Sequence, residues 1–186
     1  LNGAVFSLLT GGAGNSNYWH WLFDVLPRIK ILENKIDIKE IDFYLFPDLK
    51  EKFQIETLDL LKIPVDKRLS SRFYRHVEIT NSYSVDHPYV INNNPTNEIQ
   101  NIPYWIIDYL KEKFLMNTSD KFPKKFFIDR SDAKSNHSHL RRIINEEEVK
   151  KRLIKKGFSI IKLSDLSFKD QVSLFNNATE IVGLLK

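Results

Sequence analysis

The stretch that decides the fold lies at residues 4–28 and reads AVFSLLTGGAGNSNYWHWLFDVLPR. Its first six residues form an apolar run of the length of a buried strand. A glycine-rich loop, GGAG, follows, and from residue 18 to residue 34 apolar side chains recur with the period of a helix. A strand, a glycine-rich loop and a helix in this order predict the first βα unit of an α/β protein.

The rest of the chain continues this alternation. Strands are predicted at residues 42–46, 73–79, 125–128, 158–163 and 180–182, and helices at 49–62, 104–114, 146–156 and 168–178. The alternation predicts an α/β fold of Rossmann type, with parallel sheets and flanking helices. An Asn- and Pro-rich loop at 81–103 and a polar break at 116–123 interrupt it. We therefore predict two domains, residues 1–118 and 119–186.

Composition excludes several classes of protein. The 186 residues are 42% hydrophobic and 12% aromatic, which is enough for a packed core. The absence of cysteine excludes disulfides, a thiol nucleophile and cysteine-based zinc sites. No apolar run approaches the roughly 18 residues of a membrane-spanning helix, and we expect a cytoplasmic protein. His137 and His139 have no third ligand nearby in the sequence, so no metal site is predicted.

The positive charge of the chain is concentrated in its second half. The formal net charge is +4, which is too small to predict nucleic-acid binding without a recognisable motif. The lysines of residues 150–156 are best explained as the solvated face of a helix that begins with a capping box at Asn145 and Glu148 and ends at Gly157. Three arginines lie outside that helix: Arg130, Arg141 and Arg142.

The glycine-rich loop allows two interpretations. Backbone N–H groups at Gly12 and Gly14, ahead of a helix that starts near Asn17, have the placement of a phosphate or sugar cradle. The dinucleotide fingerprint is incomplete, because Asn17 stands where the third glycine belongs. A tight turn followed by an Asn cap explains the same residues.

The helix that follows places His20 and Asp24 four residues apart, and Arg28 four residues further on, so these side chains share one face. A carboxylate beside an imidazole fixes its tautomer, which a general base requires. Trp19 and Trp21 flank His20, and aromatic rings commonly stack on sugars. A buried histidine with a purely structural role is the alternative.

A third candidate site is Arg130, which lies at the carboxyl end of the strand predicted at residues 125–128. The carboxyl ends of parallel strands form the usual ligand-binding edge of an α/β sheet. Arginine is suited to bidentate binding of phosphate. Surface ion pairs with Asp129 and Asp132 are an equally good explanation.

The order of these motifs resembles that of glycosyltransferase family sixty-one. The run NYWHWLFDVLPR at residues 17–28 is similar to the N-terminal signature of that family. Later elements that recur in its order are Arg130-Ser131-Asp132, Arg141-Arg142 with Asn145-Glu146, Gly157-Phe158, Leu166-Ser167-Phe168 with Gln171 and Phe175, and Ile181-Val182-Gly183. The resemblance covers most of the chain and is weakest at residues 35–122.

The resemblance implies a GT-B architecture, with residues 1–118 as the acceptor-side domain and 119–186 as part of the donor-side domain. It also implies inverting transfer of a sugar from a nucleotide-sugar to a hydroxyl group of a glycan, as in capsular polysaccharide biosynthesis, with no tightly bound metal or cofactor.

Specific roles follow from the same resemblance. His20 and Asp24 would face the cleft, where one of them would deprotonate the acceptor. Arg130, with Arg141 or Arg142, would neutralise the departing nucleoside diphosphate.

The chain departs from the family pattern after Gly183. Family members continue with a Gly-His-Gly-Ala-Gly-like loop that lines the donor site, whereas this chain has Leu184-Leu185-Lys186. We therefore expect an incomplete second domain. The alternative function is a non-catalytic carbohydrate- or nucleotide-binding domain derived from such an enzyme.

Overall fold

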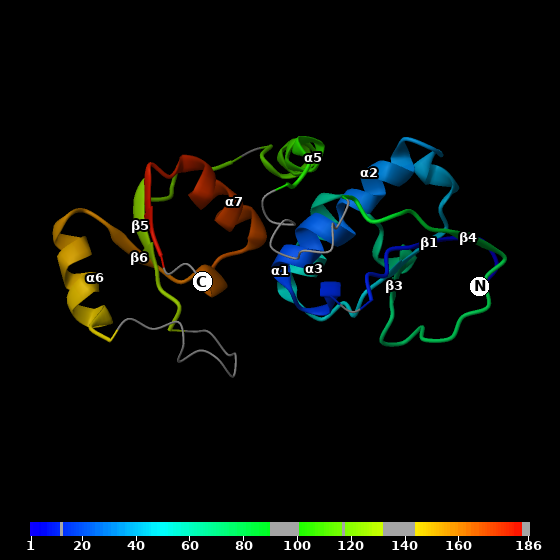
Figure 1. Ribbon diagram of the computed structural model, residues 1–186, viewed down its shortest axis with the longest axis horizontal. Helices are drawn as coiled ribbons and strands as arrows, with labels where there is room; N and C mark the ends of the chain where they lie inside the picture. The colour runs from blue at the N-terminus through cyan, green and yellow to red at the C-terminus, as the bar shows by residue number, and fades with distance from the viewer. Residues whose placement is uncertain (12, 90–100, 117, 132–143, 184–186) are drawn as a thin grey trace. The chain divides into compact units, whose positions relative to one another are not determined.

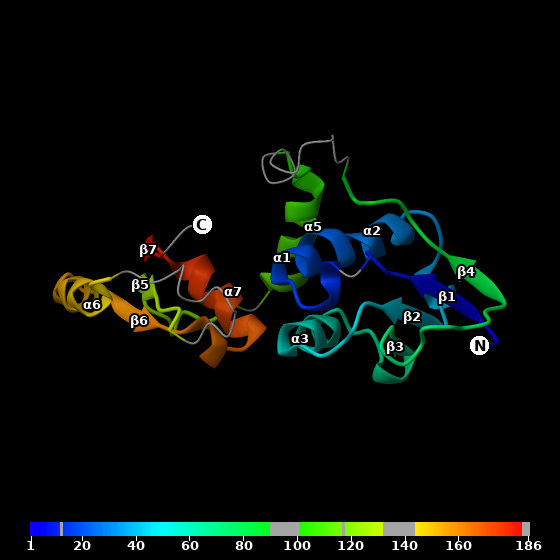
Figure 2. The same cartoon turned by 60° about the horizontal axis from the view of Figure 1, so that its bottom comes forward.

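The computed structural model describes residues 1–11, 13–89, 101–116, 118–131 and 144–183. The chain divides into two compact units, Leu1–Phe114 and Leu115–Lys186. Each unit has its own sheet and its own helices, which Figures 1 and 2 show from two directions.

The first unit contains a four-stranded parallel sheet. Its strands are β1 (Ala4–Ser7), β2 (Phe43–Phe46), β3 (Arg68–Ser70) and β4 (Asn81–Tyr83), in the spatial order β3-β2-β1-β4. In the register of the sheet, Phe6 of β1 is the partner of both Tyr44 and Tyr83. The strand order reverses beside β1, because the chain moves outward through β2 and β3 before β4 pairs with the other edge of β1.

Helices follow or flank these strands. They are α1 (Tyr18–His20), a π-helical turn η2 (Trp21–Val25), α2 (Pro27–Glu33), α3 (Lys52–Leu60) and α5 (Tyr104–Phe114). Short 3-10 turns are η1 (Ala13–Asn15), η3 (Ile38–Glu40) and η4 (Val65–Lys67). Helix α2 packs against α5.

The core of the first unit is built around Trp21. Its indole is fully buried and contacts the rings of Phe46 on β2 and Phe53 on α3. The indole N–H donates a hydrogen bond of 2.8 Å to the hydroxyl of Thr57, which in turn donates to the Phe53 carbonyl. This polar contact satisfies the indole inside an apolar environment, as a buried tryptophan requires.

The second unit contains a three-stranded parallel sheet in the order β6-β5-β7. The strands are β5 (Lys125–Ile128), β6 (Ser159–Ile161) and β7 (Glu180–Val182), and the helices are α6 (Glu146–Lys155) and α7 (Phe168–Asn177), with a 3-10 turn η6 at Leu163–Asp165. Phe126 and Phe127 on the central strand are buried together with Phe168 and Leu174 of α7.

The α/β fold with parallel sheets and flanking helices agrees with the sequence prediction. In the part of the chain that the structure describes, no helix has both the length and the apolar character needed to cross a membrane.

The strand predicted at residues 73–79 is wrong. The segment has no regular structure, and Phe73 is 78% exposed. The strands of this region are β3 and β4, on either side of it, because Leu69 pairs in register with Leu45 and Ser82 pairs with Val5. A segment rich in aromatic and β-branched residues forms a strand only where a neighbouring strand of the sheet can pair with it.

The capping box predicted at Asn145 is also wrong. Asn145 is the N-cap of α6, but its side chain makes no capping hydrogen bond. The three glutamates of the first turn still complement the helix dipole. The predicted end of this helix is confirmed, since Gly157 has the left-handed φ of +82°.

The Trp21–Thr57 contact generates a stability prediction. The variant Thr57→Val leaves the buried indole N–H without its acceptor and should lower the free energy of unfolding by about 1–3 kcal/mol. Thr80→Val is the matched control, because Thr80 is exposed, and it should change stability by less than about 0.5 kcal/mol. Urea unfolding monitored by circular dichroism measures both. Equal stability of the two variants would contradict the role assigned to Thr57.

Candidate active site

The candidate site lies where the strand order of the first sheet reverses. Ligands of open α/β sheets bind outside the carboxyl ends of the strands at such a point, because the chain leaves neighbouring strands in opposite directions there. In this sheet the point lies between β1 and β4. The segments that leave these two strands therefore define the site.

The helix after β1 begins at an Asn cap. The side chain of Asn17 accepts hydrogen bonds from the backbone N–H groups of Trp19 and His20, at 2.9 and 3.3 Å. This satisfies donors that a helix N-terminus otherwise leaves open. Asn17 thus fixes the backbone at His20.

The turn that follows is wider than an α-helical turn. The Leu26 N–H donates to the Trp21 carbonyl, five residues back, over 3.1 Å. The next residue, Pro27, has no N–H group and its ring crowds the carbonyl four residues earlier, so the regular ladder cannot continue through it. Such π turns occur frequently at functional sites, and this one carries Asp24.

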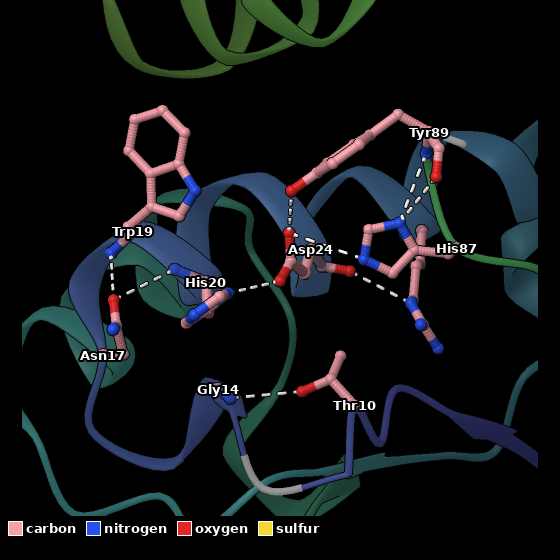
Figure 3. A network of polar contacts seen from close by, with 9 residues as sticks. Thr10, Gly14, Asn17, Trp19, His20, Asp24, His87 and Tyr89 are labelled. Atoms are coloured by element: carbon pink, nitrogen blue, oxygen red, sulfur yellow. Dashed lines mark hydrogen bonds and ion pairs between the residues drawn. The ribbon is translucent and has the colours of Figure 1, made fainter. Parts of the chain in front are cut away.

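His20 and Asp24 are in direct contact. His20 Nδ1 lies 2.6 Å from Asp24 Oδ2 (Figure 3). An ionised carboxylate only accepts hydrogen bonds, so Nδ1 carries the proton and Nε2 keeps its lone pair in the neutral ring. Asp24 is buried, with 5% of its surface exposed, whereas the His20 side chain is 31% exposed. The pair thus combines a buried carboxylate with a partly exposed imidazole whose Nε2 keeps its lone pair.

The structure adds two residues that the sequence analysis missed. The Tyr89 hydroxyl donates a hydrogen bond of 2.7 Å to Asp24 Oδ1, and His87 Nε2 lies 3.6 Å from the same oxygen. Both residues belong to the segment after β4, and Figure 3 shows them converging on Asp24. The signal available in the sequence was Asp86-His87-Pro88-Tyr89, a cluster of polar and aromatic residues in a loop.

His87 is tied to the backbone of the same segment. Its Nδ1 lies 2.9 Å from the Tyr89 carbonyl oxygen, and its ring meets the Tyr89 ring edge-on, with centroids 4.5 Å apart. These contacts hold the two side chains as one unit against Asp24.

Arg28 connects the helix to the end of β1. Its Nε donates to the Asp24 carbonyl and its Nη1 to the Leu9 carbonyl, both over 3.0 Å. Burial lowers the pKa of Arg28, while the charges of Asp24 and Asp86 oppose that shift. The guanidinium therefore serves mainly as a clamp between the helix and the loop.

The glycine loop has packing reasons of its own. The Gly14 N–H donates to the Thr10 hydroxyl over 3.2 Å, and the Gly14 carbonyl accepts from the Gln54 side chain. A Cβ atom on Gly14 would lie only 2.7 Å from Val25 Cγ2. Gly12 lies outside the described residues. The contacts of Gly14 and the capping by Asn17 are those expected of a tight turn.

The two tryptophans beside His20 differ in their surroundings. Trp21 is buried in the core and cannot stack on a sugar. Trp19 stacks on Phe23, with ring centroids 4.2 Å apart, and Figure 3 shows its ring to one side of the His20–Asp24 pair.

In the second unit, Arg130 follows β5 at the carboxyl edge of the sheet. Within the described residues no ion pair of Arg130 is found. Its neighbour Asp129 is buried and forms an ion pair with Lys150, with 3.0 Å between Asp129 Oδ2 and Lys150 Nζ. Of the ion pairs considered as the alternative explanation of Arg130, the one with Asp129 is not found, because Asp129 pairs with Lys150. Arg141, Arg142, Asp132, His137 and His139 lie outside the described residues.

The Asp129–Lys150 pair anchors the turn that carries Arg130. Burial by itself raises the pKa of Asp129, but hydrogen bonds from Ser131 and Lys150 outweigh it and hold the pKa below its ordinary value. Hydrogen bonding to Glu146, with a smaller contribution from Asp129, raises the pKa of Lys150 although burial opposes the shift.

No group of three or more metal-ligating side chains suited to a metal ion occurs among residues 1–11, 13–89, 101–116, 118–131 and 144–183.

The Asp129–Lys150 pair predicts a pH-dependent stability. A carboxyl group with a lowered folded-state pKa contributes stability above its unfolded pKa of about 3.9, and this contribution is lost as the pH falls through the folded pKa. Lys150→Met should lower the free energy of unfolding by about 1–2 kcal/mol at pH 7. Between about pH 5 and about pH 3 the free energy of unfolding of this variant should fall less than that of the wild type.

Lys151→Met, at an exposed neighbouring position, is the control, and urea unfolding across this pH range is the measurement. Parallel pH curves for Lys150→Met and the wild type would contradict the assigned role of the pair.

Comparison with known proteins identifies the family of the chain. The family described as Glycosyltransferase 61 matches residues 18–185, a span that begins with helix α1 and includes both sheets except β1. Neither the curated proteins nor the solved structures contain a significant match. Since the matched span covers far more than half of the chain, the chain belongs to glycosyltransferase family 61.

Proposed function

We propose that this chain is an inverting glycosyltransferase in which His20 is the general base. It would move a sugar from a nucleotide-sugar to a hydroxyl group of a glycan acceptor, in polysaccharide biosynthesis, without a tightly bound cofactor. The observation that carries the proposal is the 2.6 Å contact between His20 Nδ1 and Asp24 Oδ2, which leaves Nε2 as a basic atom on a partly exposed ring. We also propose a GT-B architecture, supported by a parallel sheet in each unit.

The transfer forms one bond and breaks one bond at the anomeric carbon. His20 Nε2 takes the proton of the acceptor hydroxyl while its oxygen forms a bond to the anomeric carbon of the donor sugar. The bond from that carbon to the diphosphate oxygen breaks, and its electron pair leaves with the nucleoside diphosphate. Asp24 stabilises the imidazolium that forms, because its carboxylate accepts the Nδ1 hydrogen bond.

The contacts of Asp24 favour His20 as the base and a single displacement. Asp24 Oδ2 accepts from His20 and Oδ1 accepts from Tyr89. A buried carboxylate with both oxygens engaged is poorly placed to take the acceptor proton or to attack a sugar carbon. A single displacement assisted by one base inverts the configuration at the anomeric carbon.

The leaving diphosphate needs positive charge. Arg130 lies two residues after the end of the central strand of the second sheet, at the edge where α/β sheets bind ligands. Residues 121–156 contain 12 Lys and Arg against 5 Asp and Glu, which favours an anionic ligand. We propose that Arg130, with Arg141 or Arg142, binds the diphosphate.

His20→Gln tests the base directly. Glutamine keeps a hydrogen-bonding side chain but cannot take up a proton, so kcat should fall by about 10²–10⁴. A panel of nucleotide-sugars, with transfer and hydrolysis products followed by mass spectrometry, provides the assay.

His76→Gln is the control, because His76 is exposed in the same unit, and it should retain full activity. If His20→Gln transfers sugar at the wild-type rate, His20 is not the base. If the wild-type chain binds nucleotides but transfers and hydrolyses no donor, the non-catalytic alternative replaces the proposal.

Arg130→Ala tests the diphosphate site. Loss of a bidentate guanidinium should weaken the binding of UDP, used as the probe, by about tenfold or more. Isothermal titration calorimetry measures this affinity. Arg152→Ala is the matched control, since Arg152 is exposed and paired with Glu148 on α6. Equal affinities of the two variants would remove Arg130 from the donor site.

A further inference from the structure

The segment after β4 contributes a buried hydroxyl to the candidate site. Tyr89 is 6% exposed, and its hydroxyl donates to Asp24 Oδ1 over 2.7 Å. The two residues are 65 positions apart in the chain. The contact therefore depends on the tertiary fold, through the pairing of β4 with β1.

This hydrogen bond determines the orientation of the Asp24 carboxylate. The terminal torsion of an aspartate is broad, so the carboxylate of an isolated Asp side chain rotates readily. Tyr89 holds Oδ1, and the opposite oxygen, Oδ2, is then directed at His20 Nδ1. Figure 3 shows the carboxylate between the two side chains.

The tyrosine ring is positioned independently of its hydroxyl. It meets the His87 ring edge-on, with an angle of 81° between the planes. His87 Nδ1 also forms a hydrogen bond with the Tyr89 backbone carbonyl. Removing only the hydroxyl therefore leaves this packing in place, and the function of the O–H group is separable from that of the ring.

We infer that Tyr89 is a positioning residue, whose hydroxyl fixes the Asp24 carboxylate so that His20 is held in the Nδ1–H tautomer with Nε2 free to act as a base. The catalytic use of that nitrogen rests on the proposed function. The positioning itself does not, because it is a property of the protein without substrate.

The test is the tautomer of His20 in the whole chain. Long-range 1H–15N correlation spectra of the 15N-histidine-labelled protein at neutral pH distinguish the two tautomers, and the spectrum of His20→Gln identifies the His20 signals among the five histidines. The wild type should show one tautomer with the proton on Nδ1. In Tyr89→Phe the carboxylate is released, and the proton should redistribute between the two nitrogens.

Tyr44→Phe is the matched control. The Tyr44 hydroxyl is part of the same unit but donates to the Ile38 carbonyl, so its removal should leave the His20 spectrum unchanged. Thermal unfolding of each variant checks the fold. A merely structural role for Tyr89 would lower the melting temperature without changing the tautomer.

Asp24→Asn provides a second, independent comparison. If Tyr89 acts through the Asp24 carboxylate, the hydroxyl has no further effect once that carboxylate is gone. The His20 signals of the single variant Asp24→Asn and of the double variant Asp24→Asn/Tyr89→Phe should then coincide.

Three results would overturn the inference: an Nε2–H tautomer in the wild type, an unchanged His20 tautomer in folded Tyr89→Phe, or different His20 signals in the two Asp24→Asn proteins. None of them depends on sugar transfer, so they are distinct from a failure of the proposed function, which His20→Gln reports through activity.

Discussion

The buried carboxylate of Asp24 is the constraint on which the first unit depends. A charge with only 5% exposure must be compensated by hydrogen bonds, and here the donors come from two distant segments. His20 lies one turn earlier on the helix after β1, and the Tyr89 hydroxyl comes from the segment after β4. His87 of the same segment lies close by, with Nε2 3.6 Å from Asp24 Oδ1. The same contacts that satisfy the charge therefore join the two segments that leave the sheet at its point of strand reversal.

The helix after β1 has core residues on one face and the polar residues of the candidate site on another. Trp21 and Val25 are buried in the core, and the Trp21 indole is satisfied by Thr57. His20 and Asp24 occupy the face toward the segment after β4. Asn17 caps the start of this helix and Pro27 widens its turn at Asp24. A single stretch of about ten residues thus contributes both the centre of the core and the acid–base pair.

The sequence predicts local features of the fold well and long-range contacts poorly. The bounds of β5, β7 and α5 match the predicted ranges, because their apolar patterns are strong and their flanks are polar or contain proline. The strand predicted at residues 73–79 failed because pairing in the sheet, and not β-propensity, selects Arg68–Ser70 and Asn81–Tyr83. The spacing of His20 and Asp24 placed them on one helix face, but no spacing in the chain reveals that Tyr89 meets Asp24 across 65 residues.

The most direct test of the account is a crystal structure of the protein with a nucleoside diphosphate and an acceptor glycan bound. If His20 is the base and Asp24 its partner, the acceptor hydroxyl oxygen should lie within about 2.6–3.2 Å of His20 Nε2, while Asp24 keeps its contacts with His20 Nδ1 and the Tyr89 hydroxyl. An acceptor hydroxyl bound to another residue, with His20 Nε2 directed away from it, would contradict the central claim.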